Sequence, residues 1–125
     1  MVQSGSNLAI FAMHRESAGL PDMKTQADVR DFLSRCDLSA LGPNGLDVAE
    51  ATFVYLAAFT TPSATFDLRA FEAVTAPIKE IDADVDTDTL IEFSLAHGFV
   101  AEREGGRYEP DPKIHEIVKE IPEYE

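Results

Sequence analysis

The chain has 125 residues, 45% hydrophobic and 26% charged, which is the composition of one globular domain and excludes a disordered chain. Its 23 acidic residues against 10 basic ones give a net charge of −13, a field that repels nucleic acids and anionic membranes and favours basic partners. No apolar run approaches the roughly 20 residues that a membrane helix needs, and the single cysteine excludes an intramolecular disulfide.

Residues 1–24 contain Ser, Gly and Pro around one short apolar stretch, Leu8 to Met13. This composition predicts a flexible N-terminal arm, and we expect the folded domain to span residues 25–125. The arm lacks the basic start and small-residue cleavage site of a secretory signal. With the absence of a membrane-length run, this indicates a cytoplasmic protein.

The first helix is expected to begin at Thr25, because Asp28 three residues later completes an approximate capping box. We expect it to run over residues 25–41. Spacings of three and four then place a set of apolar side chains on one face, as in an amphipathic helix. These are Val29, Phe32, Leu33 and Cys36.

A second helix is expected from Asp47, and its body at 48–59 is apolar almost all round, which indicates a central helix buried on several sides. A short strand is expected at 64–66. Asp67 can then cap a third helix, which Pro77 limits. Its inward-facing residues are predicted to be Leu68, Phe71 and Val74.

Four aspartates occupy every second position before the fourth helix: Asp82, Asp84, Asp86 and Asp88. An EF-hand calcium loop also begins this way, but in both registers its required Gly and Glu positions hold other residues, so no metal is expected. The better explanation is that Asp86, Thr87 or Asp88 caps the helix and that the helix dipole favours the adjacent carboxylates. The helix should run from about Asp86 or Thr87 to His97, with Gly98 as its left-handed C-terminal residue.

Residues 99–110 are typical of a β-hairpin with a two-residue turn at Gly105-Gly106. That register would place Glu104 opposite Arg107, and Arg103 opposite Tyr108. A final amphipathic helix is expected at 113–121. Its apolar side comprises Ile114, Ile117, Val118 and Ile121.

The order of elements over residues 47–112 resembles that of the winged helix-turn-helix superfamily. The segment LIEFSLAHGFVAEREGGRYEPDP, residues 90–112, resembles the end of its third helix and the wing. The resemblance implies a mainly α domain with a small β-hairpin. The helices at 25–41 and 113–121 would be flanking additions, which often serve dimerisation in that superfamily, so a homodimer through them would be expected.

DNA readers of this superfamily insert the third helix into the major groove and lay the wing on the backbone. Here the helix at 86–97 has no Lys or Arg for phosphates or base edges. We therefore expect a non-enzymatic protein that contacts a basic partner, as an adaptor or a DNA-mimicking inhibitor of a nucleic-acid-handling machine. Its candidate partner-binding residues are Asp82, Asp84, Asp86, Asp88, Glu92, Glu102 and Glu104.

The alternative is a winged-helix transcription regulator from a high-salt cytoplasm. At about 1 M salt the Debye length is only about 3 Å, so the acidic surface would no longer repel DNA at a distance. Its candidate DNA-binding residues are Arg69, Lys79, Arg103 and Arg107. A third hypothesis is a structural subunit that docks on a larger assembly through Leu8 to Met13.

No motif in the sequence predicts an enzyme or a cofactor. The stretch HEIVK at 115–119 has Lys119 where a zinc protease needs its second histidine. Cys36 lies on an apolar helix face without a positive neighbour that would favour a thiolate, so an inert thiol is expected. A Gly-rich phosphate loop and a nucleophile-elbow serine are also missing.

Overall fold

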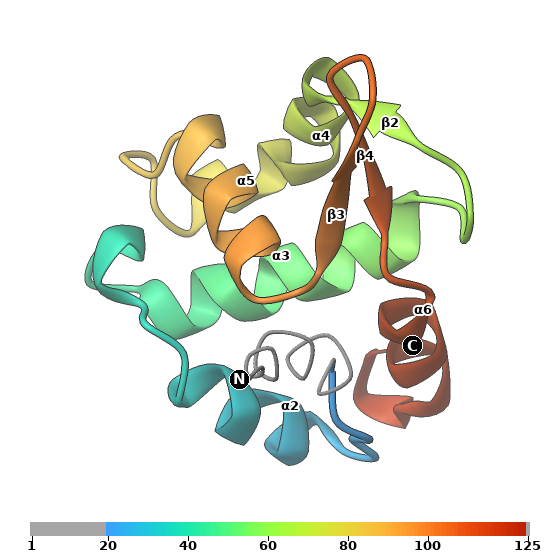
Figure 1. The fold of residues 1–125 in the computed structure, drawn as a ribbon. Helices are drawn as coiled ribbons and strands as arrows, with labels where there is room; N and C mark the ends of the chain where they lie inside the picture. Colours follow the sequence, from blue (N-terminus) through green and yellow to red (C-terminus); the bar gives the residue numbers. More distant parts are fainter. Residues whose placement is uncertain (1–19, 125) are drawn as a thin grey trace, which may run out of the picture.

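The protein is described here by a computed structural model that covers residues 20–124; the predicted apolar stretch Leu8 to Met13 lies outside the described residues. Within this range the fold is mainly helical with one small antiparallel sheet (Figure 1), as the sequence predicted. In chain order the elements, with η marking 3-10 helices, are α2 (Gln26–Ser34), η1 (Ser39–Leu41), α3 (Gly45–Phe59), β2 (Phe66–Asp67), α4 (Leu68–Thr75), η2 (Ala76–Glu80), α5 (Thr87–Ala96), β3 (Val100–Arg103), β4 (Arg107–Pro110), α6 (Pro112–Glu120) and η3 (Pro122–Tyr124).

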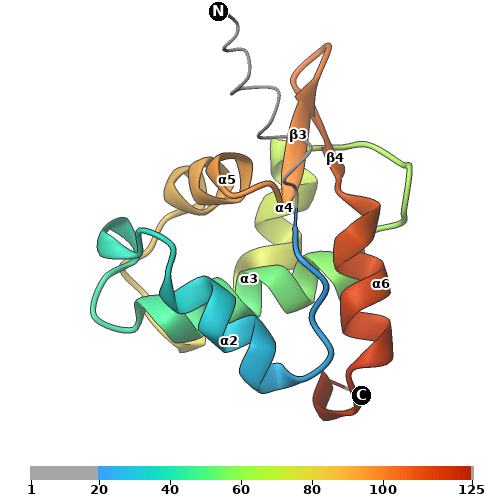
Figure 2. The same ribbon diagram turned by 60° about the horizontal axis from the view of Figure 1, so that its bottom comes forward.

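Helix α3 is the centre of the molecule, with α2, α4 and α6 packed around it (Figures 1 and 2). Its fully buried side chains include Val48, Phe53 and Leu56, which confirms the expectation of a helix covered on several sides. Its C-terminal end escapes this cover, since Phe59 is 63% exposed.

The start of α2 is confirmed, but its predicted end is wrong. The Thr25 hydroxyl accepts a hydrogen bond from the Asp28 backbone N–H, and the Asp28 carboxylate accepts one from the Thr25 backbone N–H. The helix stops at Ser34 instead of residue 41. The reason is local, because the Asp37 carboxylate accepts hydrogen bonds from the backbone N–H and hydroxyl of Ser39 and so starts the separate turn η1.

The sheet has the strand order β2-β4-β3, so the hairpin is joined by the short strand expected before the third helix. Asp67 caps α4 as predicted, its carboxylate accepting from the Ala70 backbone N–H at 2.9 Å. Leu68 was expected to face inward, but it is 37% exposed because it is the first residue of α4, at the edge of the core. Helix α4 ends at Thr75, and the chain continues through Pro77 as η2.

The predicted hairpin forms, but the predicted register is wrong by one residue. Arg103 lies opposite Arg107, and Glu102 lies opposite Tyr108, so three residues form the turn. Two like charges directly opposite destabilise a hairpin. Here the side chains diverge: Arg103 turns to its diagonal neighbour Glu109 at 2.8 Å, and Arg107 binds the Thr65 hydroxyl at 2.8 Å and carbonyl at 2.9 Å.

The flanking segments complete the core of this chain. Leu20 and Met23, which the sequence assigned to the arm, are 6% and 4% exposed. The predicted apolar side of α6 packs on α3, with Ile114 and Ile121 fully buried. The apolar faces of the flanking helices are thus used within the chain itself.

A polar network around Glu50 of α3 fastens both flanks. Its carboxylate accepts hydrogen bonds from the Gln26 amide at 2.9 Å and the Tyr124 hydroxyl at 2.6 Å, and it forms an ion pair with Arg30. Arg30 also reaches Asp47 at 3.2 Å. Helix α2, the central helix and the C-terminal turn are therefore joined at one carboxylate.

Candidate partner-binding surface

Helix α5 is fixed in place by aromatic packing on one side. Phe99, fully buried just after the helix, makes edge-to-face contacts with Phe53 of α3 and Phe93 of α5, with ring centroids 5.2 and 5.6 Å apart. The helix ends as predicted at His97, whose ring lies 4.6 Å from that of Phe93, followed by Gly98 with φ of +80°. This packing determines which face of α5 looks outward.

The outward face of α5 carries carboxylates. Leu90, Ile91, Phe93 and Ser94 point into the protein. Asp88 and Glu92, one helical turn apart, are exposed on the opposite side. Helix α5 is therefore accessible from outside along these two carboxylates.

Asp86 is the N-cap of α5, one of the three residues that the sequence offered for this role. Its carboxylate accepts a hydrogen bond from the Thr89 backbone N–H at 2.8 Å. Hydrogen bonds from the Thr89 hydroxyl and backbone lower the pKa of Asp86, and the charge of Lys79 makes a smaller contribution. Asp86 thus stays ionised and exposed while serving as the cap.

Asp82 and Asp84 differ from one another in their surroundings. Asp82 is half-buried, and its carboxylate accepts from the Asp84 backbone N–H at 3.0 Å. The other oxygen lies next to Gly42, where an added Cβ would come within 2.8 Å of it. Asp82 therefore shapes the loop, whereas the Asp84 side chain is exposed.

We define the acidic face as Asp84, Asp86, Asp88 and Glu92. Within residues 20–124 no salt bridge neutralises any of these four carboxylates. The nearest lysine in sequence, Lys79, points its ammonium to the Val85 carbonyl at 3.2 Å. The four charges are therefore available to a cation from outside.

Glu102 and Glu104 lie elsewhere. Both are exposed, one on β3 and one in the hairpin turn. The tip of the hairpin stands apart from the loop that leads into α5 in both views (Figures 1 and 2). Glu102 and Glu104 are therefore not included in the acidic face.

The four basic residues considered for DNA contact differ in their surroundings. Arg103 is paired with Glu109, Arg107 is bound to Thr65, and Lys79 is bound to Val85. Within residues 20–124 no hydrogen bond or ion pair engages the exposed Arg69 side chain. Three of these cations are thus already occupied by partners in the chain.

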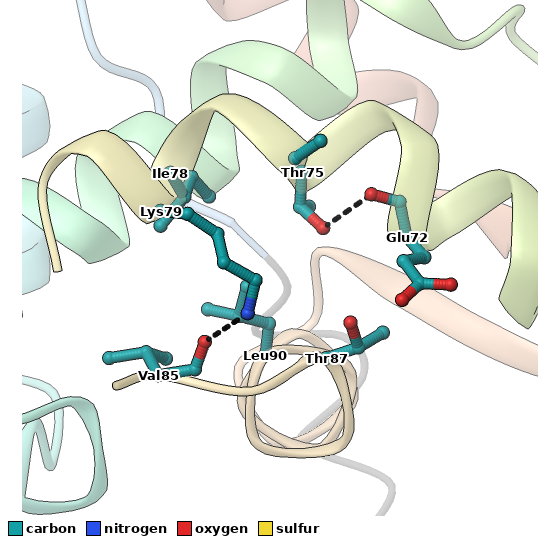
Figure 3. A pocket seen from close by; sticks show the side chains of 8 residues that line it. Glu72, Thr75, Ile78, Lys79, Val85, Thr87 and Leu90 are labelled. Carbon is teal, nitrogen blue, oxygen red and sulfur yellow. Dashed lines mark hydrogen bonds between the residues drawn. The ribbon is translucent and has the colours of Figure 1, made fainter. Parts of the chain in front are cut away.

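A small pocket opens beside the first turn of α5, between this helix and the α4–η2 segment (Figure 3). Its volume is about 110 Å³, well below the roughly 300–1,000 Å³ of small-molecule sites, and matches one side chain better than a metabolite. It is lined by Glu72, Thr75, Ala76, Ile78, Lys79, Val85, Thr87 and Leu90.

Sequence reasoning did not find this pocket. Thr75 and Ala76 follow Glu72 by three and four residues, and Lys79 follows them by four and three, which indicates one shared helical face. That this face meets Thr87 depends on the tertiary packing of α4 against α5. No pattern in the local sequence indicates this contact.

Cys36 and His115, the other candidate groups, each contact other groups of the chain. Burial raises the pKa of the Cys36 thiol, and its sulfur lies 3.7 Å from the Phe32 carbonyl, as suits an inert thiol. His115 lies half-buried with Nε2 3.0 Å from the Thr60 hydroxyl and 3.1 Å from its carbonyl, so it contacts the residue at the end of α3.

Residues 20–124 contain neither a metal-binding cluster nor a membrane-spanning helix. No three His, Cys, Asp or Glu side chains converge on a point where a metal ion could be held. None of the helices in this range has the length and apolar character needed to cross a membrane. Comparison of the chain with protein-family models, with curated proteins and with solved structures found no match.

Proposed function

We propose that this protein is a non-enzymatic, winged-helix-type adaptor or DNA-mimicking inhibitor that binds a basic protein surface through the acidic face. The supporting observation is that Asp84, Asp88 and Glu92 are exposed and free of internal salt bridges within residues 20–124. Carboxylates spaced along a helix can occupy the positions where a basic protein would otherwise bind phosphates.

The lack of basic groups on α5 and the internal contacts of the hairpin arginines support the same proposal. A helix that reads DNA needs cations for phosphates and amide or basic groups for base edges. Helix α5 has none, and the wing arginines Arg103 and Arg107 are held by Glu109 and Thr65. A negatively charged surface attracts cationic partners and repels DNA at ordinary ionic strength.

The test uses two variants with equal changes in charge. The face variant carries Asp84→Lys, Asp88→Lys and Glu92→Lys, and it keeps Asp86 so that the helix cap is preserved. The control variant carries Glu104→Lys, Glu116→Lys and Glu123→Lys, all at exposed positions. Thermal unfolding of both variants verifies that the fold is intact.

Tagged wild type, face variant and control variant are used to capture proteins from the source cell at low and high potassium, and captured proteins are identified by mass spectrometry. A basic protein retained by the wild type and control variant but lost with the face variant supports the proposal. Equal retention by all three contradicts it. In parallel, sequence-selective binding of duplex DNA at high potassium would favour a transcription regulator instead.

A further inference from the structure

We propose that the pocket beside α5 receives an arginine side chain of the basic partner. This inference rests on the proposed function, because the partner must first be drawn to the acidic face. Thr87, which lines the pocket, lies between Asp86 and Asp88 in the chain, so the pocket adjoins that face. A partner residue at the rim would meet both features together.

The lining of the pocket is apolar on one part and polar on another. Ile78, Val85 and Leu90 are buried and supply apolar surface. This surface suits the methylene stem of a long cationic side chain, which packs on apolar groups while its charged head stays polar. The small volume leaves room for one such stem.

The polar part offers several acceptors and one cation, the Lys79 ammonium, which is hydrogen-bonded to a neutral carbonyl. Figure 3 shows the Glu72 carboxylate and the hydroxyls of Thr75 and Thr87 on one side, with the Lys79 ammonium on the other. Lys79 donates to the Val85 carbonyl at 3.2 Å. Within residues 20–124 the Glu72 carboxylate has neither a hydrogen bond nor a salt bridge, so its charge is available.

Arginine fits this set of acceptors better than lysine or an aliphatic residue. Its planar guanidinium has five donors, which can serve a carboxylate and neighbouring hydroxyls at once, whereas an ammonium is a compact point charge. The Thr75 hydroxyl gives its proton to the Phe71 carbonyl at 2.9 Å, so its oxygen is left to accept. An aliphatic side chain would bury Glu72 without a partner, which is unfavourable.

The experiment compares two labelled peptides of equal length and charge, nona-arginine and nona-lysine, by fluorescence anisotropy with the full chain. We expect nona-arginine to bind about tenfold more tightly, because a bidentate charge-assisted pair adds to the shared electrostatic attraction. Glu72→Gln should remove this preference. Glu80→Gln, the matched control at another exposed glutamate, should retain it.

Two further measurements sharpen the result. Ala76→Phe places a ring in the pocket mouth and should also remove the arginine preference. In amide NMR spectra, nona-arginine should shift the signals of Thr75, Thr87 and Leu90 in the wild type. Equal affinity of the two peptides, equal effects of Glu72→Gln and Glu80→Gln, or unshifted pocket signals would overturn the pocket assignment while leaving the proposed function standing. Failure of both peptides to bind would contradict the proposed function as well.

Discussion

The Arg103 guanidinium on β3 donates a hydrogen bond to the Glu109 carboxylate on β4 at 2.8 Å. The two residues are diagonal neighbours on one face of the hairpin, because Arg103 lies opposite Arg107 and Glu109 lies opposite Ala101. The pair relieves the repulsion between two opposed arginines. The Arg103 guanidinium is thus held within the hairpin, whereas a DNA-binding wing would present such a cation to phosphate.

The two hairpin arginines, Arg103 and Arg107, should differ in their importance for stability. Arg103→Ala should lower the free energy of unfolding by less than about 1 kcal/mol, since its ion pair is largely exposed. Arg107→Ala should cost more, about 1–2 kcal/mol, because Arg107 ties β4 to Thr65 through two hydrogen bonds. Urea denaturation of both variants measures the difference, and a larger cost at Arg103 would contradict this account of the hairpin.

Gly42 should be the least replaceable of the glycines in left-handed conformation. Its φ of +82° and ψ of −170° lie in a region that is essentially confined to glycine, so an alanine there would cost about 1–3 kcal/mol, and the new Cβ would also lie 2.8 Å from an Asp82 carboxylate oxygen. Gly98→Ala is the comparison, because φ there is also positive, at +80°, but the space around an added Cβ is open. Gly42→Ala should therefore lower the melting temperature more than Gly98→Ala does. Equal shifts would show that the contact with Asp82 relaxes without cost.

Asp86 should make the stability of the protein depend on pH in the acidic range. Hydrogen bonds from Thr89 lower the pKa of Asp86 in the folded state, so its stabilising effect is present above its ordinary pKa of 3.8 and is lost as the pH falls below it. Asp86→Asn keeps a capping side chain but cannot titrate. The urea midpoint of this variant should therefore fall less than that of the wild type between pH 6 and about pH 3. Parallel curves would exclude a contribution from Asp86.

Tyr124 should stabilise the attachment of the C-terminal turn. Tyr124→Phe removes the hydrogen bond to Glu50 and should cost about 1.5 kcal/mol, a typical value for a bond to a charged group. Partial burial, and then the bond to Glu50 and its charge, raise the pKa of Tyr124 above its ordinary 10.0. The neutral hydroxyl is therefore favoured by folding, and its stabilising effect is lost as the pH rises above that value. The difference between wild type and variant should narrow in alkaline urea titrations; a constant difference would contradict the coupling.

Local signals in the sequence predicted the elements whose cause is local. The cap at Thr25, the cap at Asp86 and the left-handed Gly98 each depend on residues within one helical turn, and each is found as expected. The order of helices and the hairpin followed from such signals, and the resulting sheet order is compatible with a winged helix.

Features set by contacts between distant residues were not predictable in the same way. The hairpin register depends on where Arg103 and Arg107 find partners, and Arg107 finds Thr65 42 positions away. The role of Glu50 depends on Tyr124, 74 positions away. Likewise, the separation of Glu104 from the acidic face follows from how the hairpin stands on the core (Figure 2). The spacing of residue types along the sequence does not reveal which distant residues come into contact.

The most direct test of the central claim is the affinity of the wild type, the face variant and the control variant for one basic peptide, measured by fluorescence anisotropy at about 0.1 M salt, where the Debye length is about 10 Å. Both variants change the net charge equally, so any difference between them reports the position of the charges. We predict that the face variant loses at least about tenfold in affinity, or about 1.4 kcal/mol, and that the control variant loses much less. Equal losses in the two variants would show that only total charge matters and would contradict a binding surface on α5.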